Sequence, residues 1–240
     1  MIVNHKHKFI FLKVSKAAGS SVEAFLRKFC QEGDVVTPLN KHEEYEIRSL
    51  GLCPPMGFKT IRGQASIIDR VKIALGDKKA IQRCCIYAHS SAHDVKQYVG
   101  DDIWNSYYKF CILRNPVDRV LSQYFWTAAN KNWDDAASDF SVRFDKFLES
   151  RYFKALKYKS HDIVAINNNP VVDRIIDYGR LEESVAEIMA HLGIDCDEIT
   201  LPRFKSAQRP PGDFQKLINA QQMDLIRRTF DFETRLLEVK

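Results

Sequence analysis

The stretch YKFCILRNPVDRVLSQY, residues 108–124, decides the fold. Its first six residues, 108–113, are mostly apolar and predict a buried strand. Asn115 follows as a helix N-cap, and Pro116 stands at the first helical position, where its missing N–H costs little. Apolar side chains then recur at three- and four-residue spacing, at Val117, Val120, Leu121 and Tyr124. The stretch is therefore predicted to be a strand that leads directly into a helix.

The N-terminal segment has the same order of elements. Residues 8–14, KFIFLKV, predict a strand buried on both faces, and residues 20–30 predict a helix. Ser20 and Glu23 have the spacing of a capping box at the start of that helix. A short turn that contains Gly19 joins the two elements.

The remaining pattern continues this alternation. Further strands are predicted at 84–88 and 171–178, and further helices at 66–75, 140–157, 181–192 and 214–238. Strands that alternate with helices favour parallel pairing in a layered α/β fold. We expect one domain over residues 1–240, with an irregular insertion at 31–65 that lies near the site.

Composition limits the class of protein. The net charge is +5, and all of this surplus lies in residues 1–30, which suggests a local anion site or a basic arm. No apolar run approaches the length of about 20 residues that a membrane helix needs, and no signal peptide is apparent. The six cysteines form no CxxC pair, so a zinc or redox motif is not supported. We expect a cytoplasmic protein.

Ligands of parallel sheets bind beyond the carboxyl ends of the strands. Residues 15–21, SKAAGSS, offer helix N-terminal N–H groups and the charge of Lys16 to an anion. The alternative is a plain helix start with a solvated lysine. The turn is not a Walker A motif, because its lysine precedes its single glycine.

Two further strand ends carry candidate residues. Arg114 has the planar fork that suits a phosphate, and Ser122 lies two helical turns further on. The alternative for Arg114 is a surface pair with Asp118. His89 follows the predicted strand at 84–88 and has the pKa range of a general base, although a lone histidine is more often structural.

These pieces resemble sulfotransferases that use 3′-phosphoadenosine 5′-phosphosulfate (PAPS), especially the carbohydrate-type branch. Val14–Ser21 resembles the segment that binds the 5′-phosphosulfate in that family, and Leu113–Tyr124 resembles the segment that binds the 3′-phosphate. The usual proline and threonine of the first segment are replaced by Ser15 and Ala17. The resemblance implies a P-loop-NTPase-like three-layer sandwich, with a central parallel β-sheet flanked by helices.

The resemblance also implies roles for individual residues. Lys16 and His89 are the implied catalytic residues, the lysine at the leaving oxygens and the histidine as base on the acceptor hydroxyl. The implied cofactor-binding residues are Lys16, Ala17, Ala18, Gly19, Ser20, Ser21, Arg114, Ser122, Tyr178, Lys205 and Arg209. Arg119 is expected to converge on the same ligand, whereas Lys6, Lys8, Arg27 and Lys28 are expected to be solvated. The resemblance implies PAPS as co-substrate and no metal.

The acceptor is expected to be a glycan or a small hydroxylated molecule, lined by residues 31–65 and 126–165. The aromatic candidates for stacking on it, or for core packing, are Trp126, Trp133, Tyr152 and Phe153. Alternatives are a P-loop-like nucleotide kinase or hydrolase, a relative that binds PAPS without catalysis, and a nucleic-acid binder. No nucleic-acid motif is present, so neither a nucleic acid nor a membrane is expected as partner.

Overall fold

The computed structural model describes residues 1–58, 65–131, 139–196, 198–202, 204 and 212–238. Its main sheet has five strands in the order β3-β1-β2-β4-β7. Their bounds are Ile2–Asn4 for β1, Phe9–Leu12 for β2, Val35–Val36 for β3, Tyr108–Leu113 for β4 and Arg174–Asp177 for β7. The pairs β2–β4 and β4–β7 are parallel, whereas β1 pairs with β2 and β3 in antiparallel fashion. The prediction of parallel central strands is confirmed, and the added edge makes the sheet mixed.

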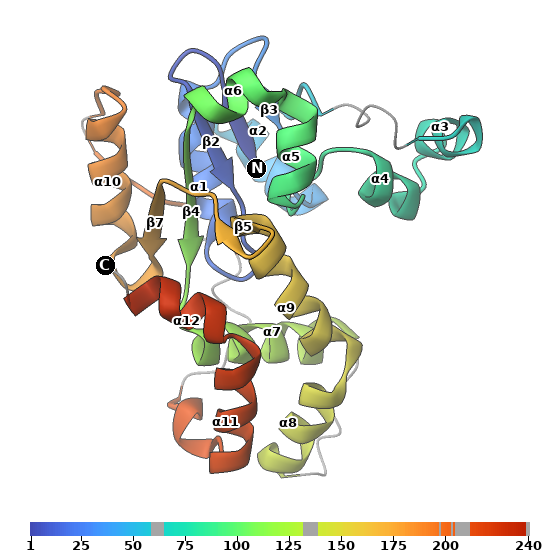
Figure 1. The fold of residues 1–240 in the computed structure, drawn as a ribbon, viewed down its shortest axis with the longest axis vertical. Coiled ribbons are helices and arrows are strands. Elements are labelled where there is room, and N and C mark those ends of the chain that lie inside the picture. The colour runs from blue at the N-terminus through green and yellow to red at the C-terminus, as the bar shows by residue number, and fades with distance from the viewer. Residues whose placement is uncertain (59–64, 132–138, 197, 203, 205–211, 239–240) are drawn as a thin grey trace.

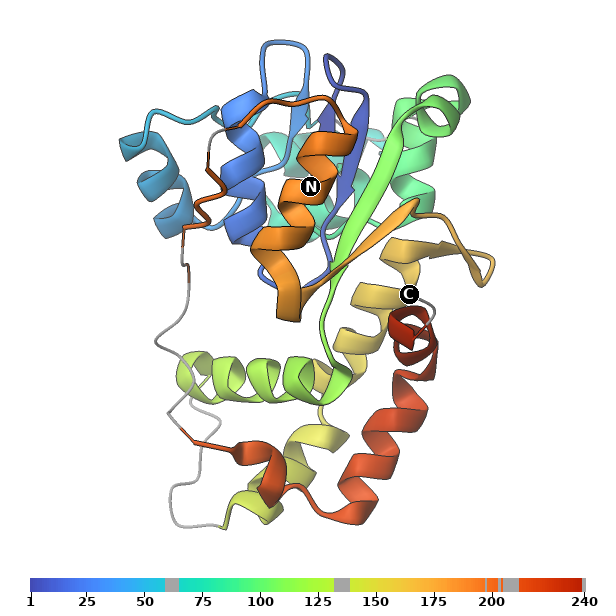
Figure 2. The same ribbon diagram turned by 90° about the vertical axis from the view of Figure 1, so that its left-hand side faces the viewer.

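Helices cover both faces of this sheet (Figures 1 and 2). Phe9 and Phe11 of β2 pack toward α1 (Gly19–Leu26) and α10 (Leu181–His191). Ile10 and Leu12 point to the other face, toward α5 (Ala92–Val99), α6 (Asp101–Ser106) and α9 (Arg151–Val164). A strand with apolar residues at successive positions is stable only when both of its faces are covered. The predicted burial of this strand on both faces is thus confirmed.

A helical layer lies beyond the end of β4 (Figure 1). It contains α7 (Pro116–Lys131), α8 (Phe140–Glu149) and α11 (Ala220–Thr229), together with part of α9. The following helix, α12 (Asp231–Glu238), packs its apolar side chains against the sheet instead. Tyr124 of α7 meets the rings of Phe144 and Phe147 edge-on, with centroids 5.4 and 5.5 Å apart. The predicted cap of α7 is confirmed, because Asn115 Oδ1 accepts the Val117 N–H at 3.0 Å.

Two helices predicted as continuous are interrupted. The predicted helix at 140–157 divides at Ser150, whose hydroxyl accepts the Tyr152 and Phe153 N–H groups and so starts α9. The predicted helix at 214–238 is a 3₁₀ turn, Phe214–Leu217, followed by α11 and α12. Asn219 caps α11 through a capping box. In both places a capping side chain ends the continuity that apolar periodicity suggests.

The prediction of a strand at 84–88 is wrong. Cys84 ends α4 (Lys78–Cys84), and the chain then turns into α5. Cys84, Cys85 and Ile86 are buried, and a short buried apolar run looks alike at a helix end and in a strand. The predicted helix at 66–75 is confirmed as α3, Ile67–Ala74, with Ser66 as its cap.

The stretch at 31–65 is more regular than predicted. It supplies β3 to the sheet and α2 (Lys41–Ser49), which begins with a capping box between Asn40 and Glu43. The predicted strand at 171–178 shortens to β7, and the predicted helix at 181–192 is α10, followed by Gly193 at a φ of 65°. A small hairpin, β5 (Ala165–Ile166) with β6 (Asn169–Pro170), completes the fold. No helix in the described part of the chain has the length and apolarity to cross a membrane.

Candidate functional site

Three predicted residues meet where β2, β4 and β7 end. Arg114, just after β4, places Nη1 3.5 Å from the carbonyl oxygen of Lys16, which lies in the turn after β2. The guanidinium carbon of Arg114 lies 4.2 Å from the centre of the Tyr178 ring, directly after β7. Cationic guanidinium groups stack favourably on aromatic faces. Parallel pairing therefore brings residues 16, 114 and 178 together from distant parts of the sequence.

The turn between β2 and α1 has an unusual backbone. Lys16 and Ala18 have positive φ values, 63° and 53°, and flank Ala17. Backbone of alternating hand directs successive N–H groups into one concavity, which is a common anion-binding arrangement. Left-handed conformations cost a non-glycine residue on the order of 1 kcal/mol each. The strain and the positive end of α1 both lie at the position predicted to hold an anion.

The predicted capping box of Ser20 and Glu23 is wrong. Ala18 is the N-cap of α1, with no side-chain cap, and its carbonyl oxygen accepts the Ser21 N–H at 3.0 Å. Glu23 turns inward instead and is fully buried. Its partners are cationic side chains, which attract a carboxylate more strongly than the helix N-terminus does.

Lys13 is a functional candidate that the sequence did not single out. Its side chain is 5% exposed and crosses Gly19, where an added Cβ would lie 2.7 Å from Lys13 Cγ. Its Nζ donates to Ser20 Oγ at 3.3 Å and to Glu23 Oε2 at 3.0 Å. The glycine in this turn is thus required by the close approach of a lysine. The spacing between Lys13 and Gly19 is the only feature of the sequence that could have indicated this contact.

Glu23 is the centre of a buried charge cluster. Its carboxylate contacts Lys13, Arg27 and the amino group of Met1. Burial alone would raise the pKa of Glu23, but the positive charges of Lys13, the amino group and Arg27 lower it to about 2. Burial lowers the pKa of the amino group itself to about 5, so at neutral pH Lys13 and Arg27 supply most of the compensating charge.

The prediction that Arg27 is solvated is wrong. Its side chain is fully buried, and Nη2 lies 3.1 Å from Glu23 Oε1 and 2.8 Å from Glu44 Oε1. Glu44 belongs to α2, so Arg27 connects α1 to the segment predicted to be an irregular insertion. The residues Lys6, Lys8 and Lys28 are exposed, as predicted.

The prediction that Arg119 faces the ligand is also wrong. This residue is 2% exposed and points from α7 to the backbone of the turn. Its Nε donates to the Ser15 carbonyl at 2.9 Å, and its two terminal nitrogens reach Ser160 Oγ at 3.0 Å and the Leu156 carbonyl at 2.9 Å. Burial lowers the pKa of Arg119 to about 10, so it remains charged at neutral pH. Arg119 therefore fastens the turn to α9.

One face of α7 runs along the site. Arg114, Asp118, Ser122 and Trp126 are spaced by four residues, so they follow one another along this face. Asp118 Oδ2 accepts from Arg114 Nε at 2.6 Å, which confirms the pairing left open as an alternative and orients the guanidinium. The Nζ of Lys16 lies 5.5 Å from the centre of the Trp126 ring. Lys16 thus reaches the α7 face that also carries Ser122.

His89 lies close to the turn although its predicted strand is absent. Its Nδ1 is 2.8 Å from the Lys13 carbonyl oxygen. A carbonyl oxygen only accepts hydrogen bonds, so Nδ1 carries the proton and Nε2 of the neutral ring keeps its lone pair. This is the tautomer in which Nε2 can act as a base.

The remaining candidates fall into two groups. Lys205, Arg209 and Trp133 are outside the residues that the structure describes. Phe153 is buried in the helical core, and Tyr152 packs against it, so these two aromatics are core residues.

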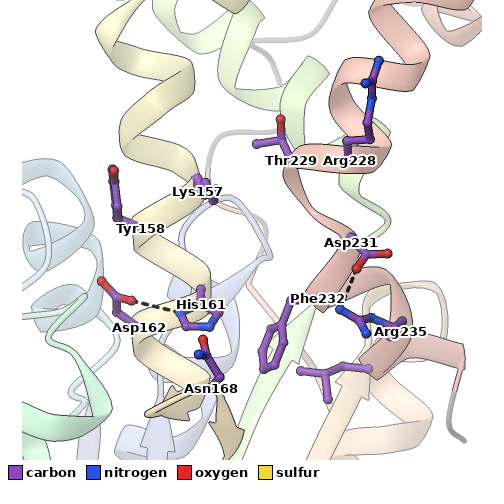
Figure 3. Close-up of a pocket in the computed structure, with 11 residues that line it drawn as sticks. Lys157, Tyr158, His161, Asp162, Asn168, Arg228, Thr229, Asp231, Phe232 and Arg235 are labelled. Carbon is purple, nitrogen blue, oxygen red and sulfur yellow. Dashed lines mark hydrogen bonds and ion pairs between the residues drawn. The ribbon is translucent and has the colours of Figure 1, made fainter.

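A groove of about 690 Å³ lies between α9 and α12 (Figure 3). Its lining includes Tyr158, His161 and Phe232, but none of the residues of the turn. Leu156 and Ser160, on the buried side of α9, contact Arg119 instead, so the groove opens on the other side of that helix.

The structure is a mixed α/β fold in which the turn between β2 and α1 lies at the carboxyl ends of the parallel strands. A family profile described as the sulfotransferase family matches residues 1–236. The chain belongs to this family, which is a family of transferases. It is also similar to a protein of Archaeoglobus fulgidus named only as uncharacterized, with 30% identity over 101 residues, 42% of this chain and 79% of the relative. No solved structure matches the chain.

Proposed function

We propose that the protein transfers the sulfuryl group of PAPS to a hydroxyl of a carbohydrate or other small hydroxylated acceptor. The observation that carries the proposal is the contact between Arg114 and the backbone of Lys16. It joins the two segments that would hold the two phosphate ends of one nucleotide. A P-loop-NTPase-like arrangement of the sheet is part of the same proposal.

The 5′ end of PAPS would lie in the turn. The N–H groups of residues 17–21 and the positive end of α1 suit the 5′-phosphosulfate. Lys16 would neutralise the charge that develops on the leaving oxygens, and this is where preorganised charge lowers a barrier most. The residue's ammonium already lies on the α7 side of the turn, above Trp126.

The 3′-phosphate would be held by Arg114 and Ser122. Asp118 and Tyr178 fix the guanidinium plane, and Arg114 Nη1 points to the turn. A fixed guanidinium loses little entropy when it forms a paired contact with phosphate. Tyr178 would thereby contribute to the nucleotide site through Arg114.

In the reaction, the acceptor oxygen attacks sulfur while the bond from sulfur to the bridging oxygen of PAPS breaks. His89 Nε2 would take the acceptor proton, and the products are a sulfate ester and 3′-phosphoadenosine 5′-phosphate (PAP). Sulfuryl transfer shares with phosphoryl transfer a loose transition state, so positioning and charge stabilisation provide most of the catalysis. In this mechanism the developing charge is stabilised by protein side chains and backbone N–H groups.

The proposal is tested by transfer of ³⁵S from labelled PAPS to a panel of glycans, lipids and small alcohols. We expect transfer by the wild-type protein and a loss of at least 100-fold in Lys16→Ala, because the developing charge is no longer stabilised. The matched control is Lys28→Ala, an exposed lysine whose loss should leave the rate unchanged. Wild-type activity in Lys16→Ala would contradict the assignment, and binding of PAP without transfer to any acceptor would favour a non-catalytic relative.

A further inference from the structure

We infer that Lys13 is a positioning residue that orients the Ser20 hydroxyl toward the 5′-phosphate of the nucleotide. The inference rests on the proposed function, because it assigns a task within the same site. It starts from the path of the lysine, which leaves the end of β2, crosses Gly19 and ends 3.3 Å from Ser20 Oγ.

The direction of the hydrogen bond determines what Ser20 can do. An ammonium group has only donors, so Ser20 Oγ must accept from Lys13. The hydroxyl hydrogen of Ser20 then remains for an acceptor on another side. Ser20 is only half-buried and is the second residue of α1, where an anion is favoured by the helix. The arrangement presents an O–H donor to an anion in the turn.

Glu23 holds the lysine in this position. Its carboxylate lies 3.0 Å from Lys13 Nζ and is compensated on its other side by Arg27. Arg27 is itself paired with Glu44, so this cluster contains two cations and two carboxylates. Lys13 remains a charged donor within it and polarises the Ser20 hydroxyl through their hydrogen bond. A hydrogen bond from a polarised hydroxyl to a phosphate is stronger than one between neutral groups.

The same lysine also touches the base candidate. Its carbonyl oxygen accepts from His89 Nδ1, so the main chain of Lys13 orients His89 while its side chain orients Ser20. Replacing the side chain leaves the carbonyl in place. A side-chain variant therefore isolates the contact with Ser20.

The test is the affinity of Lys13→Met for PAP and for adenosine 3′-phosphate, measured by titration calorimetry. PAP has a 5′-phosphate and adenosine 3′-phosphate has none. We expect Lys13→Met to weaken PAP binding about tenfold, the size of one charge-assisted hydrogen bond, and to leave the affinity for adenosine 3′-phosphate unchanged. Lys28→Met is the matched control at an exposed lysine and should change neither affinity.

Two more variants keep the inference testable if Lys13→Met does not fold. Lys13→Met with Glu23→Met removes both charges together, so that no lone carboxylate is left buried. Ser20→Ala leaves the contacts of Glu23 with Lys13 and Arg27 in place and should show the same selective loss, and adding the Lys13→Met and Glu23→Met pair to it should cost no further PAP affinity. Additive losses, or equal losses for both ligands, would overturn the inference alone. A wild-type protein that binds neither nucleotide would overturn the proposed function and this inference with it.

Discussion

The turn between β2 and α1 is held from two sides by buried charged side chains, and these charges are compensated in different ways. On one side, the anion Glu23 is surrounded by the cations Lys13 and Arg27. On the other side, the cation Arg119 donates its hydrogen bonds to neutral oxygens, those of Ser15, Leu156 and Ser160. The buried carboxylate of Glu233, which accepts from Ser160, compensates that charge only in part. The pKa of Glu23 falls to about 2, which means that its surroundings favour the charged carboxylate. The pKa of Arg119 falls to about 10, which means that burial disfavours the charged guanidinium.

Because the two sides are compensated differently, we expect one to contribute to the stability of the fold and the other to the position of the turn. A carboxylate between two cations stabilises the folded state, and removing it deprives Lys13 and Arg27 of a buried countercharge, although Arg27 keeps its pair with Glu44. A guanidinium held by carbonyl oxygens gains less, because its desolvation is only partly offset. We therefore expect the Glu23 cluster to contribute mainly to stability, and Arg119 to contribute mainly to the placement of the turn.

The largest expected effect is that of Glu23→Gln. Neutralising this residue leaves Lys13 and Arg27 with less compensation, and breaking such a buried pair costs about 3–5 kcal/mol. Urea unfolding measures the loss. Glu187→Gln is the control, because Glu187 pairs with Arg174 at the surface and such pairs contribute about 0–1 kcal/mol. Equal losses in the two variants would refute the central position of Glu23.

The second effect is the dependence of stability on pH. The folded pKa of Glu23 is about 2, below its ordinary value of 4.5. Because the folded pKa is depressed, the contribution is complete above pH 4.5 and is lost as the pH falls toward 2, by about 3 kcal/mol. Unfolding free energy measured from pH 6 to pH 2 should show this loss in the wild type and lack it in Glu23→Gln. A variant that keeps the full wild-type loss would assign it to other groups.

A smaller effect is expected for Arg119→Met. The variant loses hydrogen bonds to Ser15, Leu156 and Ser160. It no longer buries a guanidinium, but the buried Glu233 carboxylate loses the attraction of that cation, so we expect a net cost of about 2 kcal/mol. PAP affinity should fall as well, because the turn loses its tie to α9. Calorimetry and urea unfolding on one preparation separate the two effects. A stability loss as large as that of Glu23→Gln with unchanged PAP affinity would reverse the comparison.

The smallest effect is expected for Ala18→Gly. Glycine adopts the φ of 53° at this position without strain, but its unfolded chain has more entropy. These two contributions are each about 1 kcal/mol and nearly cancel, so stability should stay within about 0.5 kcal/mol of the wild type. Ala18→Val, measured alongside by thermal unfolding, should be clearly less stable. If Ala18→Gly is the less stable of the two, the strain at Ala18 is not what the backbone angle indicates.

The central parts of the fold were predictable because their signals are local. The strand and capped helix at 108–124 follow from apolar periodicity and from Asn115 and Pro116. The strands β1 and β3 have only three and two residues, too few for a periodic pattern. The helix breaks at Ser150 and Asn219 depend on caps that compete with a continuous apolar stripe.

The sequence predicts the site residues that belong to a recognisable motif. It does not predict the contacts that those segments make with residues far away in the chain. Lys16, Arg114 and Tyr178 follow from the resemblance, and the structure brings them together. The burial of Arg27 depends on Glu44, 17 residues away, and that of Arg119 depends on Ser15, 104 residues away. Charge counting treats such residues as solvated because it contains no information about tertiary partners.

The most direct test of the account is the preference of the protein for PAP over adenosine 5′-phosphate, which lacks the 3′-phosphate. Titration calorimetry on the wild type and Arg114→Ala gives this ratio, with Arg174→Ala at the opposite end of the sheet as control. We predict that the wild type and the control bind PAP at least tenfold more tightly, and that Arg114→Ala binds both nucleotides alike. An unchanged preference in Arg114→Ala would contradict the assignment of the 3′-phosphate to the strand end at Arg114.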